Sequence, residues 1–232
     1  MPAMARIAVI SDVHANLEAL QEVLRLVQGM ELYCLGDLVG YGAEPNEVVD
    51  ALRQRRAVCV LGNHDHAALT GDAAIFNARA AMSSRWTTTE LTGSSIDYLR
   101  GLPKEVRLQV DGVGAYLTHG SPDDNLWEYV DPSTHNLLFD HYLGKLGVGL
   151  IGLGHTHVPY TWKQQRGVVF NPGSVGQPRD GDRRASYALV SVTGGRVEVE
   201  NLRVEYDYQK AASKIRAAGL PEFFADRLYI GT

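Results

Sequence analysis

The residues most able to do chemistry are acidic, amide and imidazole side chains that directly follow short apolar runs. They are Asp12 and His14, Asp37, Asn63 and His64, His119, and His155 with His157. Apolar runs of this length predict β-strands, and in open α/β sheets binding sites gather beyond the carboxyl ends of the strands. Because all these side-chain types can bind a divalent cation, the pattern predicts a metal site at one edge of a sheet.

The composition of this set narrows the kind of metal. Two aspartates, one asparagine and several histidines, with no cysteine among them, suit Mn²⁺, Fe, Zn²⁺ or Ni²⁺ better than Cu(I), and they are too rich in imidazole for Mg²⁺ or Ca²⁺. One tetrahedral zinc takes about four ligands, whereas about six or seven fit two cations about 3.5–4 Å apart that share one carboxylate. Paired divalent cations activate a water, so we expect hydrolysis by a hydroxide that bridges two metals.

The spacing within two pairs supports convergence on one site. Asp12 and His14 are two residues apart, as are His155 and His157, so in an extended chain both members of each pair face the same way. Glycines beside the candidate ligands permit tight turns and close approach of the backbone to a cation. These glycines are Gly36, Gly62, Gly120 and Gly154.

In chain order these residues form five blocks that resemble the signature of the calcineurin-like metallophosphoesterases. The blocks are Asp12-x-His14, Gly36-Asp37, Gly62-Asn63-His64-Asp65, His119-Gly120 and Gly154-His155-x-His157. Segments 11–16, 171–179 and 218–221 resemble a bacterial single-domain subgroup of the same family, so the resemblance covers nearly the whole chain. Asp65 stands where many members carry Glu, which preserves the carboxylate.

The resemblance implies a role for each block. It places Asp12, His14 and His157 on one metal, Asn63, His119 and His155 on the other, and Asp37 between the two. It makes His64 the catalytic histidine, which would stabilise the phosphoryl oxygens or protonate the departing alkoxide. Asp65 would orient that ring, or, as the alternative, cap the helix that follows.

Several further residues are candidate substrate contacts. They are Asn16, Tyr41, Asn77, Arg79, Trp127 and Arg179. Arg179 follows a turn-rich segment and could hold a phosphate with two hydrogen bonds, or instead form a structural salt bridge. Trp127 and Tyr129 lie in a polar loop, where they could stack on a nucleobase or pack into the core.

The hydrophobic pattern predicts the elements that position these residues. In the first third of the chain, strands at 7–10, 32–35 and 58–61 alternate with helical spacing at 16–27 and 47–52, an order that builds a parallel sheet covered by helices. The second half predicts strands at 106–110, 114–118, 148–153, 168–171, 187–192 and 197–202, and helices at 134–146 and 208–218. The family resemblance implies an α/β fold in which two packed mixed β-sheets are flanked by helices, an α/β/β/α sandwich.

Residues 66–102 are rich in alanine, threonine and serine, with apolar residues at helical spacing. We expect a helical insertion there, which either flanks the active-site groove as a cap and contacts substrate, or packs as an extra layer away from it. The pattern contains no linker or repeat, so residues 1–232 are predicted to form a single domain.

Composition limits the partners and the compartment. The net charge of −5 disfavours stable nucleic-acid binding, and with it a nuclease. Cys34 and Cys59 lie in apolar runs and are expected to be reduced core thiols. The N-terminus lacks an apolar signal region, and no apolar stretch approaches the roughly 20 residues that span a bilayer, so we expect no membrane partner and a cytoplasmic location.

The expected function is therefore dinuclear-metal-dependent hydrolysis of a small phosphate ester, such as a phosphodiester, a nucleotide or a dinucleoside polyphosphate. A phosphomonoesterase or phosphoprotein phosphatase that uses the same centre stays open as the alternative. A non-catalytic metal-bound scaffold is disfavoured by the intact His64 and the full ligand set. The ligand blocks recognise the phosphate and not the group attached to it, so the substrate, the native metal and the oligomeric state stay open.

Overall fold

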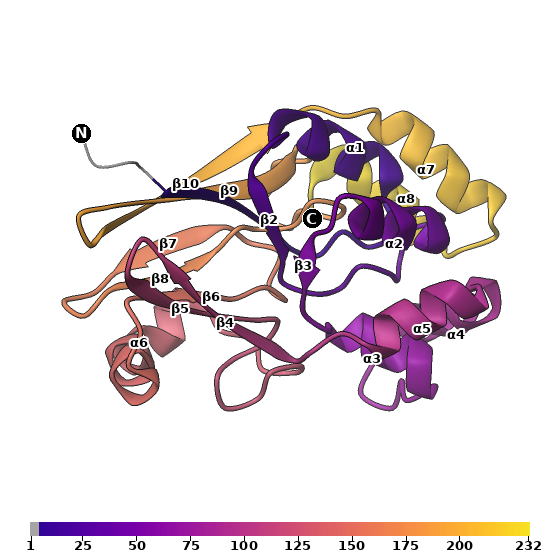
Figure 1. The fold of residues 1–232 in the computed structure, drawn as a ribbon. Coiled ribbons are helices and arrows are strands. Elements are labelled where there is room, and N and C mark those ends of the chain that lie inside the picture. The colour runs from indigo at the N-terminus through magenta and orange to yellow at the C-terminus, as the bar shows by residue number, and fades with distance from the viewer. Residues whose placement is uncertain (1–4) are drawn as a thin grey trace.

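Two five-stranded mixed sheets pack face to face, and helices cover their outer faces (Figure 1). The computed structural model describes residues 5–232, apart from the side chains of Ala5 and residues 134–136. The strand orders are β10-β9-β1-β2-β3 in the first sheet and β4-β5-β6-β8-β7 in the second. This arrangement confirms the predicted α/β/β/α sandwich.

The first sheet comprises β1 (Ala5–Ile10), β2 (Glu31–Cys34), β3 (Val58–Cys59), β9 (Ala185–Thr193) and β10 (Arg196–Val204). The second comprises β4 (Glu105–Val110), β5 (Val113–Thr118), β6 (Leu150–Gly152), β7 (Tyr160–Lys163) and β8 (Val168–Asn171). β1, β2 and β3 run parallel, as do β5, β6 and β8, so the carboxyl ends of these six strands can meet at one edge of the sandwich.

Alternation along the strands divides the core. On β1, Val9 faces the second sheet and packs in one cluster with Leu117 and Phe170, while its neighbour Ala8 faces the helices. Successive side chains of a strand point to opposite faces, so strands buried on both sides are apolar throughout. The ends of the central strands are therefore held rigidly by packing on both faces.

The helices form two outer layers and one flank. They are α1 (Leu17–Leu26), α2 (Pro45–Gln54), α3 (Asn63–Thr70), α4 (Ala78–Glu90), α5 (Gly93–Arg100), α6 (Pro132–Leu146), α7 (Tyr208–Ala217) and α8 (Glu222–Ile230). In Figure 1, α1, α2, α7 and α8 lie over the first sheet, α6 lies under the second, and α3, α4 and α5 gather at one end. The helical character expected for residues 66–102 is confirmed, and α3 begins earlier, at Asn63.

Two elements differ from the sequence-based expectation. Strand β7 was not predicted, although aromatic and polar residues alternate along Tyr160–Lys163, because the run has only four residues and forms a partly exposed edge of the second sheet. Helix α8 was not predicted because Gly219 and Pro221 indicate a chain turn, which the structure uses to start another helix. That helix buries Phe224, Ala225 and Leu228 against the first sheet's helical layer.

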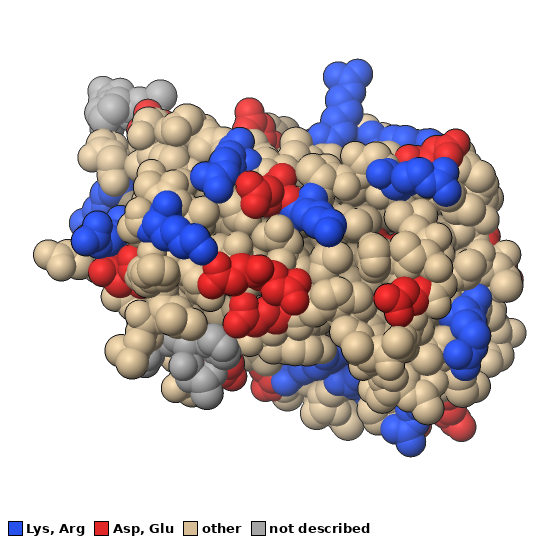
Figure 2. Space-filling view, turned by 90° about the horizontal axis from the view of Figure 1, so that it is seen from below, with Lys and Arg blue, Asp and Glu red and all other residues tan. Residues whose placement is uncertain are grey.

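The charge distribution on the surface and the lengths of the helices indicate whether nucleic acid or a membrane could be a partner. Figure 2 shows the face seen from below Figure 1, on which basic and acidic side chains of the described residues are interspersed without a continuous basic stripe. This distribution gives long nucleic acid no electrostatic track on that face. Among the residues described, no helix is both long and apolar enough to cross a bilayer.

Candidate metal centre and active site

The seven predicted metal-binding residues are all buried and lie just beyond the carboxyl ends of strands. Asp12 and His14 follow β1, Asp37 follows β2, Asn63 opens α3 after β3, His119 follows β5, and His155 and His157 follow β6. Two groups of three have candidate ligand atoms within 4.8 Å of one another: Asp12, His14 and His157, and Asp37, His119 and His155. The first group has the three residues that the family resemblance implied, whereas the second contains Asp37 in place of Asn63.

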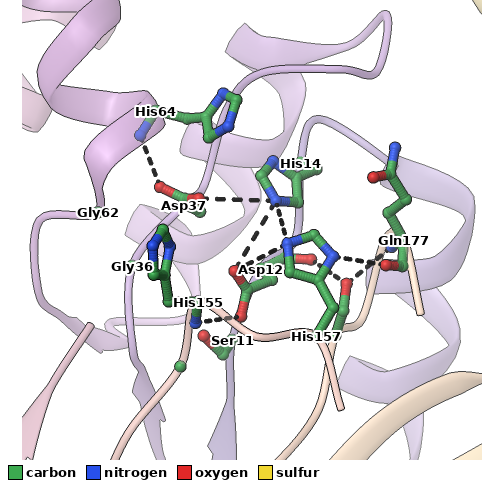
Figure 3. Close-up of polar contacts among 12 residues, drawn as sticks. Ser11, Asp12, His14, Gly36, Asp37, Gly62, His64, His155, His157 and Gln177 are labelled. Carbon is green, nitrogen blue, oxygen red and sulfur yellow. Dashed lines mark hydrogen bonds and ion pairs between the residues drawn. The ribbon is translucent and has the colours of Figure 1, made fainter. Parts of the chain in front are cut away.

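The first group is compact, and Figure 3 shows its three side chains pointing toward one another. Nε2 of His14 lies 3.0 Å from Nε2 of His157, and Nε2 of His157 lies 3.3 Å from Oδ1 of Asp12. That carboxylate oxygen is buried and has no hydrogen-bond partner among the described residues. A buried, unpaired carboxylate oxygen is costly unless a cation binds it.

The second group has the same character. Nε2 of His119 lies 2.9 Å from Oδ1 of Asn63, 3.1 Å from Nδ1 of His155 and 3.4 Å from Oδ2 of Asp37. Asn63 therefore joins this group as an oxygen donor. An amide oxygen, a carboxylate oxygen and two imidazole nitrogens form a donor set that suits a divalent transition metal.

Asp37 connects the two groups. Its Oδ2 atom lies 3.6 Å from Nε2 of His14 in the first group and 3.4 Å from Nε2 of His119 in the second. Its Oδ1 atom accepts a hydrogen bond of 2.8 Å from the backbone N–H of His64, which fixes the carboxylate. One oxygen within reach of both groups is the geometry that a shared carboxylate requires.

The second nitrogen of each imidazole is held by the backbone. Nδ1 of His14 faces the carbonyl of Val39 at 3.1 Å, and Nδ1 of His157 faces that of Gln177 at 2.5 Å. A carbonyl only accepts, so each Nδ1 carries the proton and the two Nε2 lone pairs point at each other. His119 bonds the Leu35 carbonyl at 2.8 Å in the same way, and Nε2 of His155 lies 3.3 Å from the Trp127 carbonyl.

Opposed lone pairs about 3 Å apart repel unless a proton or a cation lies between them. The same backbone hydrogen bonds fix the tautomer of each ring, as is usual for metal-bound histidine. The buried carboxylates, the unpaired oxygen and the opposed nitrogens therefore fit two divalent cations, one in each group.

The backbone around the ligands is not extended, which corrects the premise that the paired ligands sit on straight chain. Asp12, His14, Asp37, His155 and His157 all have positive φ, between 50° and 68°. The loops after β1 and β2 interlock instead, because the N–H of Asp12 donates to Gly36 and that of His14 donates to Asp37, each at 3.0 Å. The directions of these side chains are therefore set by hydrogen bonds between loops and not by the alternation of a β-strand.

Close approach explains one of the glycines. A Cβ atom on Gly62 would lie 2.1 Å from Oδ1 of Asp37 and 2.2 Å from its backbone nitrogen. Any larger residue would push the shared carboxylate out of place. Glycine is therefore required here by contact with Asp37.

Burial and mutual charge shift the pKa values of these groups. Burial lowers the pKa of His155 to about 3 and that of His157 well below its usual range, which keeps both rings neutral and able to bind metal. Burial would also raise the pKa of Asp37, but the neighbouring His119 and His64 outweigh it and hold that pKa far below its usual range. Burial likewise opposes a proton on His119, yet the charge of Asp37 outweighs it and raises the pKa of His119 to about 9.

His64 lies beside both groups without joining them. Its ring stacks on Phe76, with centroids 4.4 Å apart, and lies 4.3 Å from the ring of Tyr41. Its Nδ1 atom is buried and has no partner among the described residues. Burial lowers the pKa of His64 to about 4, so the ring is neutral at pH 7 and offers one N–H donor.

Asp65 does not orient that ring, which corrects the primary expectation for this residue. Its oxygens accept hydrogen bonds from the backbone N–H groups of Gly62 and Val39, each at 3.0 Å, whereas Nδ1 of His64 has no hydrogen-bond partner in the described structure. Asp65 therefore caps α3, the alternative that the sequence left open, and ties that helix to the loop that carries Asp37.

A pocket of about 130 Å³ opens beside His64. Its walls are Tyr41, Asn63, His64, Ile75, Phe76, Asn77, Ala80, Trp127, Tyr129 and His155. Three predicted substrate contacts, Tyr41, Asn77 and Trp127, thus line it. Ile75 and Phe76 were not predicted, because apolar residues in the loop between two helices carry no signal of the surface that they face.

The other substrate candidates lie elsewhere. Asn16 is buried as the cap of α1, where it accepts from the N–H of Ala19 and donates to the carbonyl of Gly176, so its side chain joins two backbone segments. Arg79 is exposed and stacks 4.4 Å over the ring of Phe223, outside the pocket. Arg179 lies beside the pocket, with its Nη2 atom 3.5 Å from the hydroxyl of Tyr41.

Known proteins resemble this chain in sequence and in fold. A family model described as the calcineurin-like phosphoesterase superfamily domain matches residues 5–195. An uncharacterized protein of Methanocaldococcus jannaschii is 35% identical, and the alignment covers 97% of this chain and 98% of that protein.

Two solved structures superpose over almost the entire chain. The crystal structure of a metallophosphoesterase from Sphaerobacter thermophilus has a TM-score of 0.83 at 36% identity, and the match covers 99% of this chain and 100% of that one. A hypothetical protein of Pyrococcus horikoshii OT3 has a TM-score of 0.86 at 22% identity, with 98% of each chain covered, and shares the fold.

Proposed function

This chain belongs to the calcineurin-like phosphoesterase superfamily and is a metal-dependent hydrolase, and we propose that it cleaves small phosphodiesters, nucleotides or dinucleoside polyphosphates. The observation that carries the proposal is the set of imidazole nitrogens and buried carboxylates that face one another in two groups. We assign Asp12, His14 and His157 to one cation, Asn63, His119 and His155 to the other, and Asp37 to both. The cations would be Mn, Fe, Zn or Ni, since imidazole-rich sites disfavour Mg²⁺ and Ca²⁺.

When bound, two such cations supply an activated water and neutralise charge on the phosphoryl oxygens. The remaining work belongs to the protein. The N–H of the neutral His64 ring can donate to a phosphoryl oxygen or to the leaving oxygen as charge develops there. The orientation of the His64 ring is fixed by packing against Phe76 and Tyr41. Held donors of this kind lower the barrier without reorganisation.

The pocket indicates what the phosphate is attached to. Phe76, Trp127 and Tyr129 give it aromatic walls, and the Tyr129 ring lies 3.8 Å from that of His155. The Phe76 and Trp127 rings meet edge to face, with centroids 5.7 Å apart. A flat apolar group such as a nucleobase or an aryl ring can stack there while the phosphate reaches the ligand groups. This favours an ester with an aromatic or nucleoside group over a phosphoprotein.

A substrate panel tests the proposal. The purified protein is assayed with Mn²⁺ on bis(p-nitrophenyl) phosphate, p-nitrophenyl phosphate and diadenosine tetraphosphate, and again after chelation. We expect hydrolysis of the diester and of the dinucleotide, lost on chelation and restored by metal. Preference for the monoester would instead favour the phosphomonoesterase, and undiminished activity with verified empty sites would contradict the two-metal mechanism.

A further inference from the structure

Two arginines meet at one neutral side chain beside the candidate metal centre. Arg179 lies in the loop after β8, and Arg227 lies on α8. Nη2 of Arg179 and Nη1 of Arg227 both donate to Oε1 of Gln177, each at 3.1 Å. Two guanidinium groups that share one amide oxygen are brought close by the fold and not by attraction to each other.

Neither arginine forms an ion pair with an Asp or Glu side chain of the described residues, although acidic side chains lie close by in the sequence; Nε of Arg227 donates to the main-chain oxygen of Thr232. Asp180 and Asp226 pair with the arginines Arg203 and Arg216. Nε of Arg179 is buried and has no hydrogen-bond partner in the described structure. Burial and the charge of Arg179 lower the pKa of Arg227 to about 10, which is the effect expected of neighbouring uncompensated cations.

The pair lies on the side of the first ligand group. The backbone N–H of Arg179 donates to the carbonyl of His157 at 3.3 Å. The Arg179 guanidinium lies 5.7 Å from the centroid of Tyr41, whose ring in turn lies 4.5 Å from that of His14. The carbonyl of Trp127 lies 3.3 Å from Nε2 of His155 in the second ligand group. The arginine pair therefore adjoins the first ligand group, and the aromatic pocket adjoins the second.

We infer that Arg179 and Arg227 form a binding site for a second anionic group of the substrate, a phosphate next to the one that is cleaved. Guanidinium groups bind phosphate oxygens through paired, charge-assisted hydrogen bonds, and two neighbouring ones without an Asp or Glu partner among the described residues provide such a site. This inference rests on the proposed function and narrows it, because it selects nucleotides and dinucleotides that carry a polyphosphate over simple diesters.

Anion binding without metal tests the site independently of catalysis. Metal-depleted protein is titrated with inorganic pyrophosphate by calorimetry, alongside Arg179→Gln, Arg227→Gln and Arg227→Lys. Losing one charge-assisted contact should weaken pyrophosphate binding about 10- to 100-fold in the Gln variants, and less in Arg227→Lys, which keeps the charge. Arg216→Gln is the matched control, because it removes an ion pair to α8 and leaves the arginine pair in place.

Wild-type affinity in both Gln variants would overturn the inference, as would an equal loss in Arg216→Gln. If a Gln variant fails to fold, Arg227→Lys supplies the test. Lysine keeps the charge but lacks the guanidinium group, so an unchanged affinity of Arg227→Lys for pyrophosphate would also contradict a site that binds phosphate through paired hydrogen bonds.

Kinetics of the metal-loaded enzyme supply the second readout. The ratio of kcat/KM for diadenosine tetraphosphate to that for bis(p-nitrophenyl) phosphate should fall about 10- to 100-fold in Arg227→Gln, mainly through KM. An unchanged ratio would overturn the inference while leaving the phosphoesterase intact. Loss of the proposed function would look different, because the wild type would then cleave neither ester.

Discussion

Replacing His64 by alanine should remove the chemistry and keep the metals. The backbone N–H of His64 holds Asp37 at 2.8 Å, and alanine retains that bond. The ring itself touches Phe76 and Tyr41 and belongs to neither ligand group. Removing a positioned donor costs about 10²–10⁴-fold in turnover, or at least about 2.7 kcal/mol of barrier. We therefore expect that loss in kcat with metal content unchanged.

The pH dependence sharpens this prediction. Burial lowers the pKa of His64 to about 4, so the ring is neutral throughout pH 6–9 and its contribution should be constant there. His64→Gln keeps a neutral N–H donor and should recover part of the lost rate. The assay is steady-state hydrolysis of bis(p-nitrophenyl) phosphate at several pH values, with metal analysis of each variant. Wild-type turnover in His64→Ala, loss of a metal, or an advantage that disappears as pH rises through about 6.5 would each refute the reasoning.

The remaining predictions concern the affinity for metal, the space around the His64 ring and the substrate contacts of the pocket. Asp37 stabilises a proton on His119, whose pKa is about 9, and this proton competes with a metal ion for the ring. The affinity of the protein for metal, measured by competition with a chelator, should therefore rise by up to about tenfold per pH unit between pH 7 and 9. An affinity that does not change with pH would contradict this. Gly40→Ala places a Cβ 2.7 Å from Nδ1 of His64 and should lower kcat with metals retained, whereas unchanged kcat would mean that the ring can move freely. Arg79→Ala should leave KM unchanged because Arg79 lies outside the pocket, whereas Trp127→Ala should raise KM severalfold because Trp127 lines it. A raised KM in Arg79→Ala together with an unchanged KM in Trp127→Ala would mean that the substrate binds outside this pocket.

Much of the fold was predictable because burial on both faces of the central strands leaves apolar runs that end in polar residues. Val9 and Phe170 belong to such runs, and the side chains that follow them lie at one edge as expected. The candidate ligands could be identified in the sequence for this reason before their geometry was known. The left-handed backbone at Asp12 and His155 could not be predicted, because it is imposed by hydrogen bonds between loops that are far apart in the sequence.

The substrate side was less predictable for physical reasons. Helix α4 has no marked apolar face, so nothing in the sequence indicated that Arg79 points to Phe223 and away from the pocket. Arg227 was missed because α8 itself was missed, and its closeness to Arg179 depends on how α8 packs. The role of Asp65 was open because a carboxylate at that position can either cap a helix or hold a ring, and only the contacts distinguish the two.

Metal stoichiometry tests the central claim most directly. Elemental analysis of protein loaded with Mn²⁺ or Zn²⁺ should find two ions per chain in the wild type, because two ligand groups share Asp37. Asp12→Ala should lose mainly one ion, since Asp12 belongs to one group, and Asp37→Ala should weaken both. Two ions at full occupancy in Asp37→Ala, or a wild type that saturates at one, would contradict the shared-carboxylate centre.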